Sequence, residues 1–380
     1  MSLFKNIKWK HYMNYIVIAL VTLVLGILSL TMGFPKSTIY LFEKFAIAII
    51  LAVSLNIVVG FLGELSLGHA GFMCVGAYVG GYVTVLLEDG AKSGKNIGAL
   101  LVGVLVGGIV AAACGFIIGL PALRLRGDYL AIVTLAFCEI IRTLFLNLVD
   151  LKSATISLPT PRYDTDYLFI IAFVLVLVCL AVTQNMMRSK HGRAITAIRD
   201  SEIAAHATGI NVTKYKLIAF MVSAFFAGVA GVLYSAANFN VTSATFDYNY
   251  SIEILVMVVL GGMGSINGSI ISAVVVTFLN LQLSTILTGD LAVLKDLIYA
   301  VILVLIVIYN NAPALKNIRE NYNLKAFLDK IFKKKPDAAR QNDDAARWDV
   351  VPTKIDMNEV LSVDLQVKES VSDPDKEVKD

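Results

Sequence analysis

Side chains able to make or break bonds are sparse in this sequence of 380 residues. The four histidines are scattered without a second metal ligand at helical spacing, and the four cysteines lie in apolar runs without a CxxC pair. A phosphate-binding loop GxxxxGK[ST] is missing from the sequence. The nearest approach to one has Gly90 and Gly94 one residue too close, and Asn96 stands in place of the hydroxyl residue. We therefore expect no enzyme activity, no cofactor and no metal site.

The most specific pattern lies in a polar, basic stretch at 188–216, between two apolar runs. It contains the spacing E-x-A-A-x-x-x-G, preceded by G-R-A-I-x-A-I-R-D. We expect Asp200 to cap a short helix starting at Ser201, and Gly209 to end that helix in a left-handed conformation. Thr213 is expected to cap the next span. Small residues would let a partner surface approach this helix, although an ordinary capped surface helix has similar ends. The residues assigned to the contact are Arg193, Arg199, Asp200, Glu202, Ala204, Ala205 and Gly209.

Other polar and glycine residues interrupt stretches that are otherwise apolar. Glu64, Ser66 and His69 stand between two apolar runs, where unwound backbone is tolerated only against protein or a watery cavity. Glu139 and Arg142 are at i,i+3 within another run, and we expect them to pair, because an unpaired charge there costs about 2.5–3.5 kcal/mol. The first set either lines or gates a transport route or belongs to a cytoplasmic turn with helix-packing glycines. The second set either lines the route or locks the bundle. The remaining candidates lie in a glycine-rich turn: Gly261, Gly262 and Gly264.

Positioning these residues requires a bundle of membrane helices. Hydrophobic residues make up 57% of the chain and charged residues 16%, which is too little polar surface for a soluble globule. Several apolar runs reach the roughly 20 residues that cross about 30 Å of hydrocarbon as a helix. The sequence predicts an all-α integral membrane protein, a polytopic bundle of 8–10 transmembrane helices with a re-entrant or broken segment near 252–282. The expected spans are roughly 15–34, 38–60, 67–87, 97–118, 129–148, 167–187 and 216–237, with a further one near 294–309.

The distribution of basic residues predicts the orientation of the bundle. Lys and Arg precede the first span and cluster at 188–216, which places the N-terminus and this stretch on the cytoplasmic side. Two crossing counts remain open. Either the short apolar pieces at 252–263 and 268–282 form a re-entrant hairpin, giving eight crossings, or all three late pieces cross, giving ten. Both counts place the C-terminus in the cytoplasm.

The polar stretch resembles the EAA loop of ABC importer permeases, and other motifs point to the same family. They are G-E-L-S-L-G-H-A-G-F from Gly63, G-D-Y-L-A-I-V-T-L-A-F from Gly127 and V-L-G-G-M-G-S from Val259. Together they resemble the branched-chain amino acid permeases of the LivM/LivH type, with LivM nearer, over roughly 40–310. The resemblance implies an ATPase-coupling loop within 193–209. The expected domains are a cytoplasmic N-terminus at 1–14, a transmembrane permease domain at 15–312 that includes the coupling loop 188–216, a basic amphipathic interfacial helix at 313–335 and a disordered cytoplasmic tail at 336–380.

This resemblance implies a transport subunit in a bacterial cell membrane. Its partners would be two cytoplasmic ABC ATPases, a homologous second permease subunit, an extracellular or periplasmic substrate-binding protein and membrane lipid, without nucleic acid. ATP would be hydrolysed by the partners. The implied substrates are leucine, isoleucine and valine. The alternatives are an ABC permease for urea, a nucleoside or another amino acid, and a self-sufficient secondary transporter, which has no need of an EAA-like helix.

Overall fold

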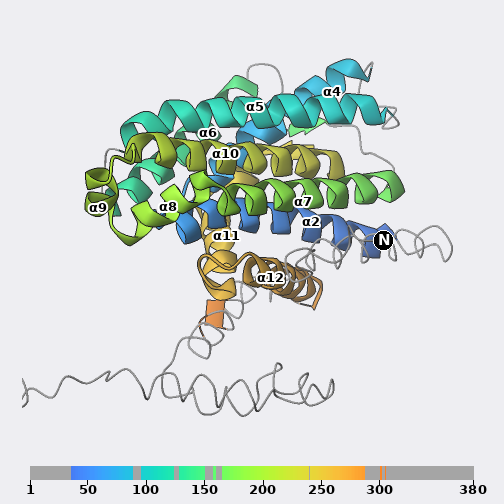
Figure 1. Ribbon diagram of the computed structural model, residues 1–380. Helices are drawn as coiled ribbons and strands as arrows, with labels where there is room; N and C mark the ends of the chain where they lie inside the picture. Colours follow the sequence, from blue (N-terminus) through green and yellow to red (C-terminus); the bar gives the residue numbers. More distant parts are fainter. Residues whose placement is uncertain are drawn as a thin grey trace, which may run out of the picture. The chain divides into compact units, whose positions relative to one another are not determined.

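The computed structural model describes a helical bundle within the compact unit Met1–Asn311 (Figure 1). The described residues are 36–88, 96–123, 128–149, 157–159, 165–238 and 240–286, with 300, 301 and 304 as isolated helical positions. The first expected span at 15–34, most of the span near 294–309, the interfacial helix at 313–335 and the tail at 336–380 lie outside these residues.

Long apolar helices make up most of the described chain. Two of the segments long enough to cross a membrane are composite. The first joins α2 (Lys36–Asn56) to the π-helical turn η1 (Ile57–Leu62), and the second joins α3 (His69–Val75), η2 (Gly76–Gly80) and α4 (Gly81–Leu87). The others are single helices: α5 (Ile97–Ala122), α6 (Asp128–Val149), α7 (Thr165–Arg188), α10 (Val212–Ala237) and α12 (Ile266–Ile286). Within the described residues, seven segments are long and apolar enough to cross a membrane. The expected polytopic all-α architecture is thereby confirmed.

Two short helices mark one end of the bundle. They are α8 (Lys190–Asp200) and α9 (Glu202–Ala207), which connect α7 to α10. Figure 1 shows α5, α10, α7 and α2 running side by side, with α8 and α9 at one end of these four helices. We call this the α9 end. Helices α2, α5, α7 and α11 end there, and helices α3, α6, α10 and α12 begin there.

Close packing of α3–η2, α5 and α10 depends on glycine. A Cβ atom on Gly76 would overlap the backbone of Gly228, and one on Gly231 would overlap the carbonyl of Met73. Gly107 faces the same contact from α5, where a Cβ would lie 3.1 Å from the Gly76 carbonyl oxygen. Small residues let membrane helices approach backbone to backbone, which strengthens their van der Waals contact. Helix α10 is buried along most of its length for this reason.

Between α10 and α11 (Tyr248–Gly261) the chain is not an α-helix. Strand β2 (Asn240–Thr242) pairs antiparallel with β1 (Ser157–Pro159), and the 3-10 turn η3 (Ser243–Phe246) follows. The Phe246 carbonyl lies 3.8 Å from the thiol of Cys138, near the midpoint of α6. Non-helical backbone therefore reaches the middle of the bundle. At about 1.5 Å per residue, the 14 residues of α11 span only about 21 Å.

The glycine-rich turn joins α11 to α12. Gly262 and Gly264 have φ of +89° and +81°, a left-handed region that favours glycine, so a tight turn forms where the sequence predicts one. The expected short piece 268–282 is longer than predicted, since α12 runs from Ile266 to Ile286 and can cross a membrane alone. The irregular backbone at 240–247 precedes the region 252–282 in which we expected the break. Neither β2 nor η3 has a recognisable signal in the sequence.

Leucine in place of Gly268 is expected to separate α11 from α12. A Cβ there would overlap the carbonyl of Gly261, and overpacking of this kind costs about 1–3 kcal/mol. Thermal unfolding in detergent should show a lower midpoint for Gly268→Leu. Gly98→Leu is the control, because Gly98 is exposed and its nearest neighbour is the Asn96 side chain. An unchanged midpoint for Gly268→Leu would show that the hairpin does not depend on this contact.

Candidate functional site

The polar stretch folds as two capped helices, but the caps differ from those expected. Ser201 is the N-cap of α9, and its hydroxyl accepts a hydrogen bond from the Ala204 amide at 3.3 Å. The expectation that Asp200 caps this helix is wrong: Asp200 ends α8, and its carboxylate accepts from the Arg199 guanidinium at 3.1 Å. Thr213 is also not the cap of α10, because Asn211 accepts from the Lys214 amide at 3.1 Å. Gly209 has the expected left-handed conformation, with φ of +83°.

The small residues of α9 have different surroundings. Ala204 and Gly209 are exposed, whereas Ala205 is buried against the bundle and serves internal packing. Ile203 points outward with 79% of its surface exposed, which is high for a large apolar residue. Arg193 is exposed on α8. The outer face of α9 therefore combines an apolar side chain with two small residues, and the α9 face is our name for Ile203, Ala204 and Gly209.

A buried ion-pair network connects α9 to the bundle. The Lys216 ammonium lies 2.6 Å from a Glu64 carboxylate oxygen and 3.3 Å from a Glu202 oxygen. The exposed fractions of these side chains are 3% for Lys216, 14% for Glu64 and 39% for Glu202. A buried ammonium needs partners because its desolvation is costly. Lys216 therefore links the first turn of α9 to the irregular segment after η1.

Arg199 makes a second connection at the same end. Its Nη1 donates to the Gly60 carbonyl oxygen at 3.3 Å, within the π-helical turn η1. Its aliphatic part covers Gly63, whose φ is +79°. A π-helical turn changes the regular hydrogen-bond ladder of a helix and is common at functional sites. The α8 end is thus seated on the turn that carries Gly60 and Gly63.

The glycine-rich turn between α11 and α12 completes this arrangement. The Gly264 amide donates to the Asn56 side chain at 2.9 Å, and a Cβ on Gly60 would overlap the Gly264 amide nitrogen. Three stretches that are far apart in the sequence therefore meet at the α9 end. They are the segment around Glu64, the segment from Arg199 to Glu202, and the turn at Gly264. We call this meeting point the α9-end junction.

Of the other expected site residues, Gly261 and Gly262 belong to the glycine-rich turn of the junction, and the rest lie away from it. Ser66 is buried, and His69 is buried with its Nε2 2.8 Å from the Ser54 hydroxyl, so both are internal to the bundle. Gly261 packs on Gly268, and Gly262 stands in the turn beside Gly264. Glu139 and Arg142 form the expected pair, with 2.8 Å between Oε2 and Nε, near the midpoint of α6.

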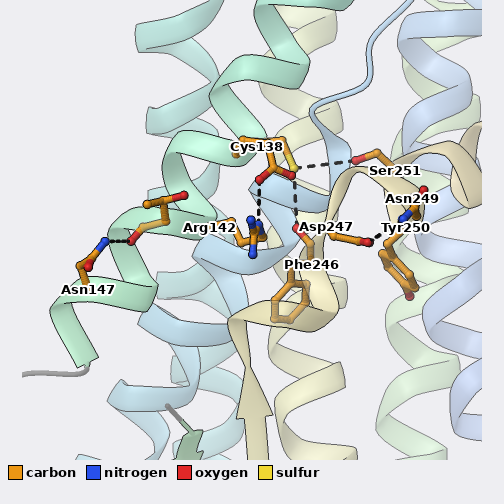
Figure 2. Close-up of polar contacts among 10 residues, drawn as sticks. Cys138, Arg142, Asn147, Phe246, Asp247, Asn249, Tyr250 and Ser251 are labelled. Carbon is orange, nitrogen blue, oxygen red and sulfur yellow. Dashed lines mark hydrogen bonds and ion pairs between the residues drawn. The ribbon is translucent and has the colours of Figure 1, made fainter.

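Sequence reasoning missed two residues at the α9 end and one helix cap elsewhere in the bundle. In the sequence, Lys216 is only the last residue of the polar stretch. Its partners Glu64 and Glu202 are 152 and 14 positions away, so no local pattern reveals the ion pairs. Ile203 lies inside the E-x-A-A spacing without being part of it. Asp247 caps α11 by accepting from the Tyr250 amide at 3.0 Å (Figure 2). The apolar run starts five residues later at Ile252, and an Asp shortly before such a run is a usable capping signal.

Known proteins similar to this chain are permeases. Residues 37–307 match the family described as "Branched-chain amino acid transport system / permease component". The chain is 38% identical over 260 residues to the high-affinity branched-chain amino acid transport system permease protein LivM of Salmonella typhimurium, covering 60% of this chain and 59% of that protein. It is 35% identical over 287 residues to LivM of Escherichia coli, covering 66% and 65%.

Part of the chain is also similar to a permease that is named for ribose. The ribose import permease protein RbsC of Escherichia coli is 30% identical over 145 residues, which cover 37% of this chain and 44% of that protein. The chain spans less than two thirds of the length of both LivM relatives. No solved structure matches it. The family match covers most of the described helices, including all three segments of the α9-end junction. The chain therefore belongs to the branched-chain amino acid permease family of the LivM type, whose members are multi-pass transport subunits.

Proposed function

We propose that this chain is a membrane-spanning subunit of an ABC importer for branched-chain amino acids, coupled to cytoplasmic ATPases through the 193–209 loop. The observation that carries the proposal is the α9-end junction. An exposed apolar side chain, Ile203, stands on a short helix that is tied by ion pairs to the interior of the bundle. This connection gives the surface helix a physical link to the membrane spans.

The junction supplies a mechanical route from the α9 face to the membrane helices. A partner seated on Ile203 and Gly209 would displace α9 when it changes conformation. Glu202 and Lys216 would pass this displacement to Glu64, which joins η1 to α3. Rigid elements joined by an ion-pair network are a physical means of coupling two sites. Alternating access follows if the helices that meet at the junction tilt together.

We also propose partners for the chain and its orientation in the membrane. The α9 end faces the cytoplasm, as do both chain termini, and two ATPase subunits bind there. A homologous second permease subunit completes the translocation route, and an extracellular or periplasmic binding protein delivers substrate. This chain itself hydrolyses no ATP. The membrane is the bacterial cell membrane.

Leucine, isoleucine and valine are the proposed substrates because the LivM relatives are named for branched-chain amino acids. The competing substrates are other small solutes, and one relative is named for ribose import. A self-sufficient secondary transporter is the less favoured alternative, since it offers no reason for the tie between α9 and the bundle.

Reconstituted uptake tests this proposal. Vesicles would contain this chain, the second permease and the two ATPases, with binding protein added on the outside. We expect labelled leucine to accumulate only with ATP, and excess isoleucine or valine to compete whereas ribose does not. Accumulation driven by an ion gradient without ATP would identify a secondary transporter. ATP-dependent uptake of ribose in place of leucine would overturn the substrate assignment.

Replacing Ile203 by serine should weaken the ATPase contact. Truncating a well-packed apolar anchor at an interface costs about 1–2 kcal/mol or more, which is about tenfold in affinity. The measurement is the dissociation constant between the membrane subunits in detergent and the ATPase. Ile109→Ser is the matched control, because Ile109 is an exposed isoleucine midway along α5. Equal affinities for Ile203→Ser and wild type would remove Ile203 from the interface.

A further inference from the structure

The outward face of α6 carries a polar stripe inside a membrane span. Glu139, Thr143 and Asn147 are spaced four residues apart, so they lie along one side of the helix. They line a hollow of about 560 Å³ together with two exposed apolar residues, Ile140 and Leu144. Ionisable groups in a membrane span face a water-filled route or another protein, because exposure to lipid is costly. This side of α6 therefore does not face lipid.

The Glu139 carboxylate in this stripe is held by a hydrogen bond to one of its two oxygens. Glu139 Oε2 accepts from Arg142 Nε at 2.8 Å. Its other oxygen, Oε1, is buried and has no hydrogen-bond partner among the described residues. A buried acceptor without a donor is costly, so a donor from outside the chain would favour a rotation of the carboxylate that brings this oxygen to the hollow. An ammonium group supplies such donors, although its attraction to the carboxylate is reduced by Arg142, which already pairs with Glu139.

Asp247 differs from Glu139 in this respect. Its Oδ1 accepts from the Tyr250 amide at 3.0 Å and its Oδ2 from the Asn249 side chain at 2.9 Å, so both oxygens are used within the first turn of α11 (Figure 2). Figure 2 also shows the Asp247 segment beside the part of α6 that carries Arg142. The irregular backbone at 240–247 thus reaches the level of the stripe. Such backbone at membrane depth is tolerated where it is buried in protein or lines a cavity.

We propose that this hollow is a transport subsite for a zwitterionic amino acid with an aliphatic side chain, and the inference rests on the proposed importer function. Glu139 binds the α-ammonium group through Oε1, with Thr143 beside it. Ile140 and Leu144 contact the aliphatic side chain. The hollow is open rather than enclosed, and its described lining residues all belong to α6, so a solute bound there would also contact a surface outside these residues. A hollow with one anionic and two apolar contacts favours such a solute over a neutral sugar.

The test uses the complete importer in vesicles, with leucine uptake and ATP hydrolysis measured in the same sample. Glu139→Gln keeps the side-chain size but removes the charge. We expect uptake per ATP hydrolysed to fall about tenfold or more, and ATP hydrolysis to stay within about twofold of wild type. Thr143→Val should lower uptake per ATP severalfold. Thr285→Val is the matched control, because Thr285 is an exposed threonine on α12 that donates to the Leu281 carbonyl, and its uptake should be unchanged.

Thiol labelling provides a second measurement that does not depend on the Glu139–Arg142 pair. With the native cysteines replaced by alanine, Thr143→Cys should react with a water-soluble thiol reagent, and leucine should slow this reaction. Reaction at the same rate with and without leucine would overturn the subsite. Normal uptake per ATP by the Glu139→Gln variant would also overturn the subsite. A Glu139→Gln variant that no longer assembles with the second permease would overturn it too, because Glu139 would then belong to the contact between the two subunits. If the wild-type complex moves no leucine, the proposed function fails independently of these variants.

Discussion

Replacing Lys216 by methionine is expected to abolish ATP-driven uptake and to destabilise the chain. Lys216 is 3% exposed, and its removal leaves the Glu64 carboxylate, which is 14% exposed, without its cation. Breaking a buried ion pair from one side costs about 3–5 kcal/mol, because the remaining charge stays desolvated. Glu202 also loses its connection to the bundle. Uptake in vesicles and thermal unfolding in detergent measure the two effects.

A matched control and a double variant separate coupling from stability. Lys214→Met removes an exposed lysine two positions earlier on α10 and should change neither uptake nor the melting temperature. The double variant Lys216→Met with Glu64→Gln removes the stranded charge, so most of the lost stability should return. Uptake should remain low because α9 is still detached from the segment around Glu64. Normal uptake by a Lys216→Met chain that is correctly inserted would refute transmission through this network.

Replacing Gly209 by leucine is expected to uncouple ATP hydrolysis from uptake while the chain remains folded. Gly209 has φ of +83°, and a Cβ there meets no other atom within 4 Å. A non-glycine residue in this conformation costs only about 1–2 kcal/mol, so the chain should insert and assemble its bundle normally. The leucine side chain would instead project from the α9 face and obstruct the ATPase. Uptake per ATP hydrolysed is the informative ratio.

Asparagine at position 209 distinguishes backbone strain from obstruction. Asn adopts the left-handed conformation more readily than other non-glycine residues and is shorter than leucine. If obstruction dominates, Gly209→Asn should retain much more uptake than Gly209→Leu, and Gly209→Ala should behave like Gly209→Asn. If Gly209→Leu couples normally, no partner surface lies close to this position. If backbone strain dominates, Gly209→Ala should lose as much uptake as Gly209→Leu, and Gly209→Asn should lose less.

The sequence predicted the membrane helices well, because the signal for each is contained in one run of residues. The span expected at 97–118 is found at Ile97–Ala122, and that at 167–187 is found at Thr165–Arg188. Apolar length alone determines whether such a helix can cross a bilayer. The irregular segment at 240–247 could not be predicted, since β2 and η3 are held by distant contacts. The Tyr78 hydroxyl, for example, donates to the Val241 carbonyl at 3.3 Å.

The candidate site was only partly visible in the sequence. Glu202 and Gly209 were selected from their spacing, and Glu64 from its interruption of an apolar stretch. Their relation through Lys216 is a tertiary contact, which a single sequence without aligned relatives does not reveal. The Asp200 cap was wrong for a local reason: two adjacent residues are both good N-caps, and the extended backbone at Ser201, with φ of −161°, places the cap there.

If the α9 face binds the ATPase, as we propose, site-specific crosslinking should detect the contact. His206→Cys, which is exposed on α9, would be paired in the assembled complex with a cysteine-reactive crosslinker, and Tyr82→Cys on α4 would serve as the control. We predict an efficient crosslink from position 206 to the ATPase that changes in yield between nucleotide-free and ATP-bound states, and none from position 82. A complex that hydrolyses ATP and imports leucine without any crosslink from position 206 would contradict the account.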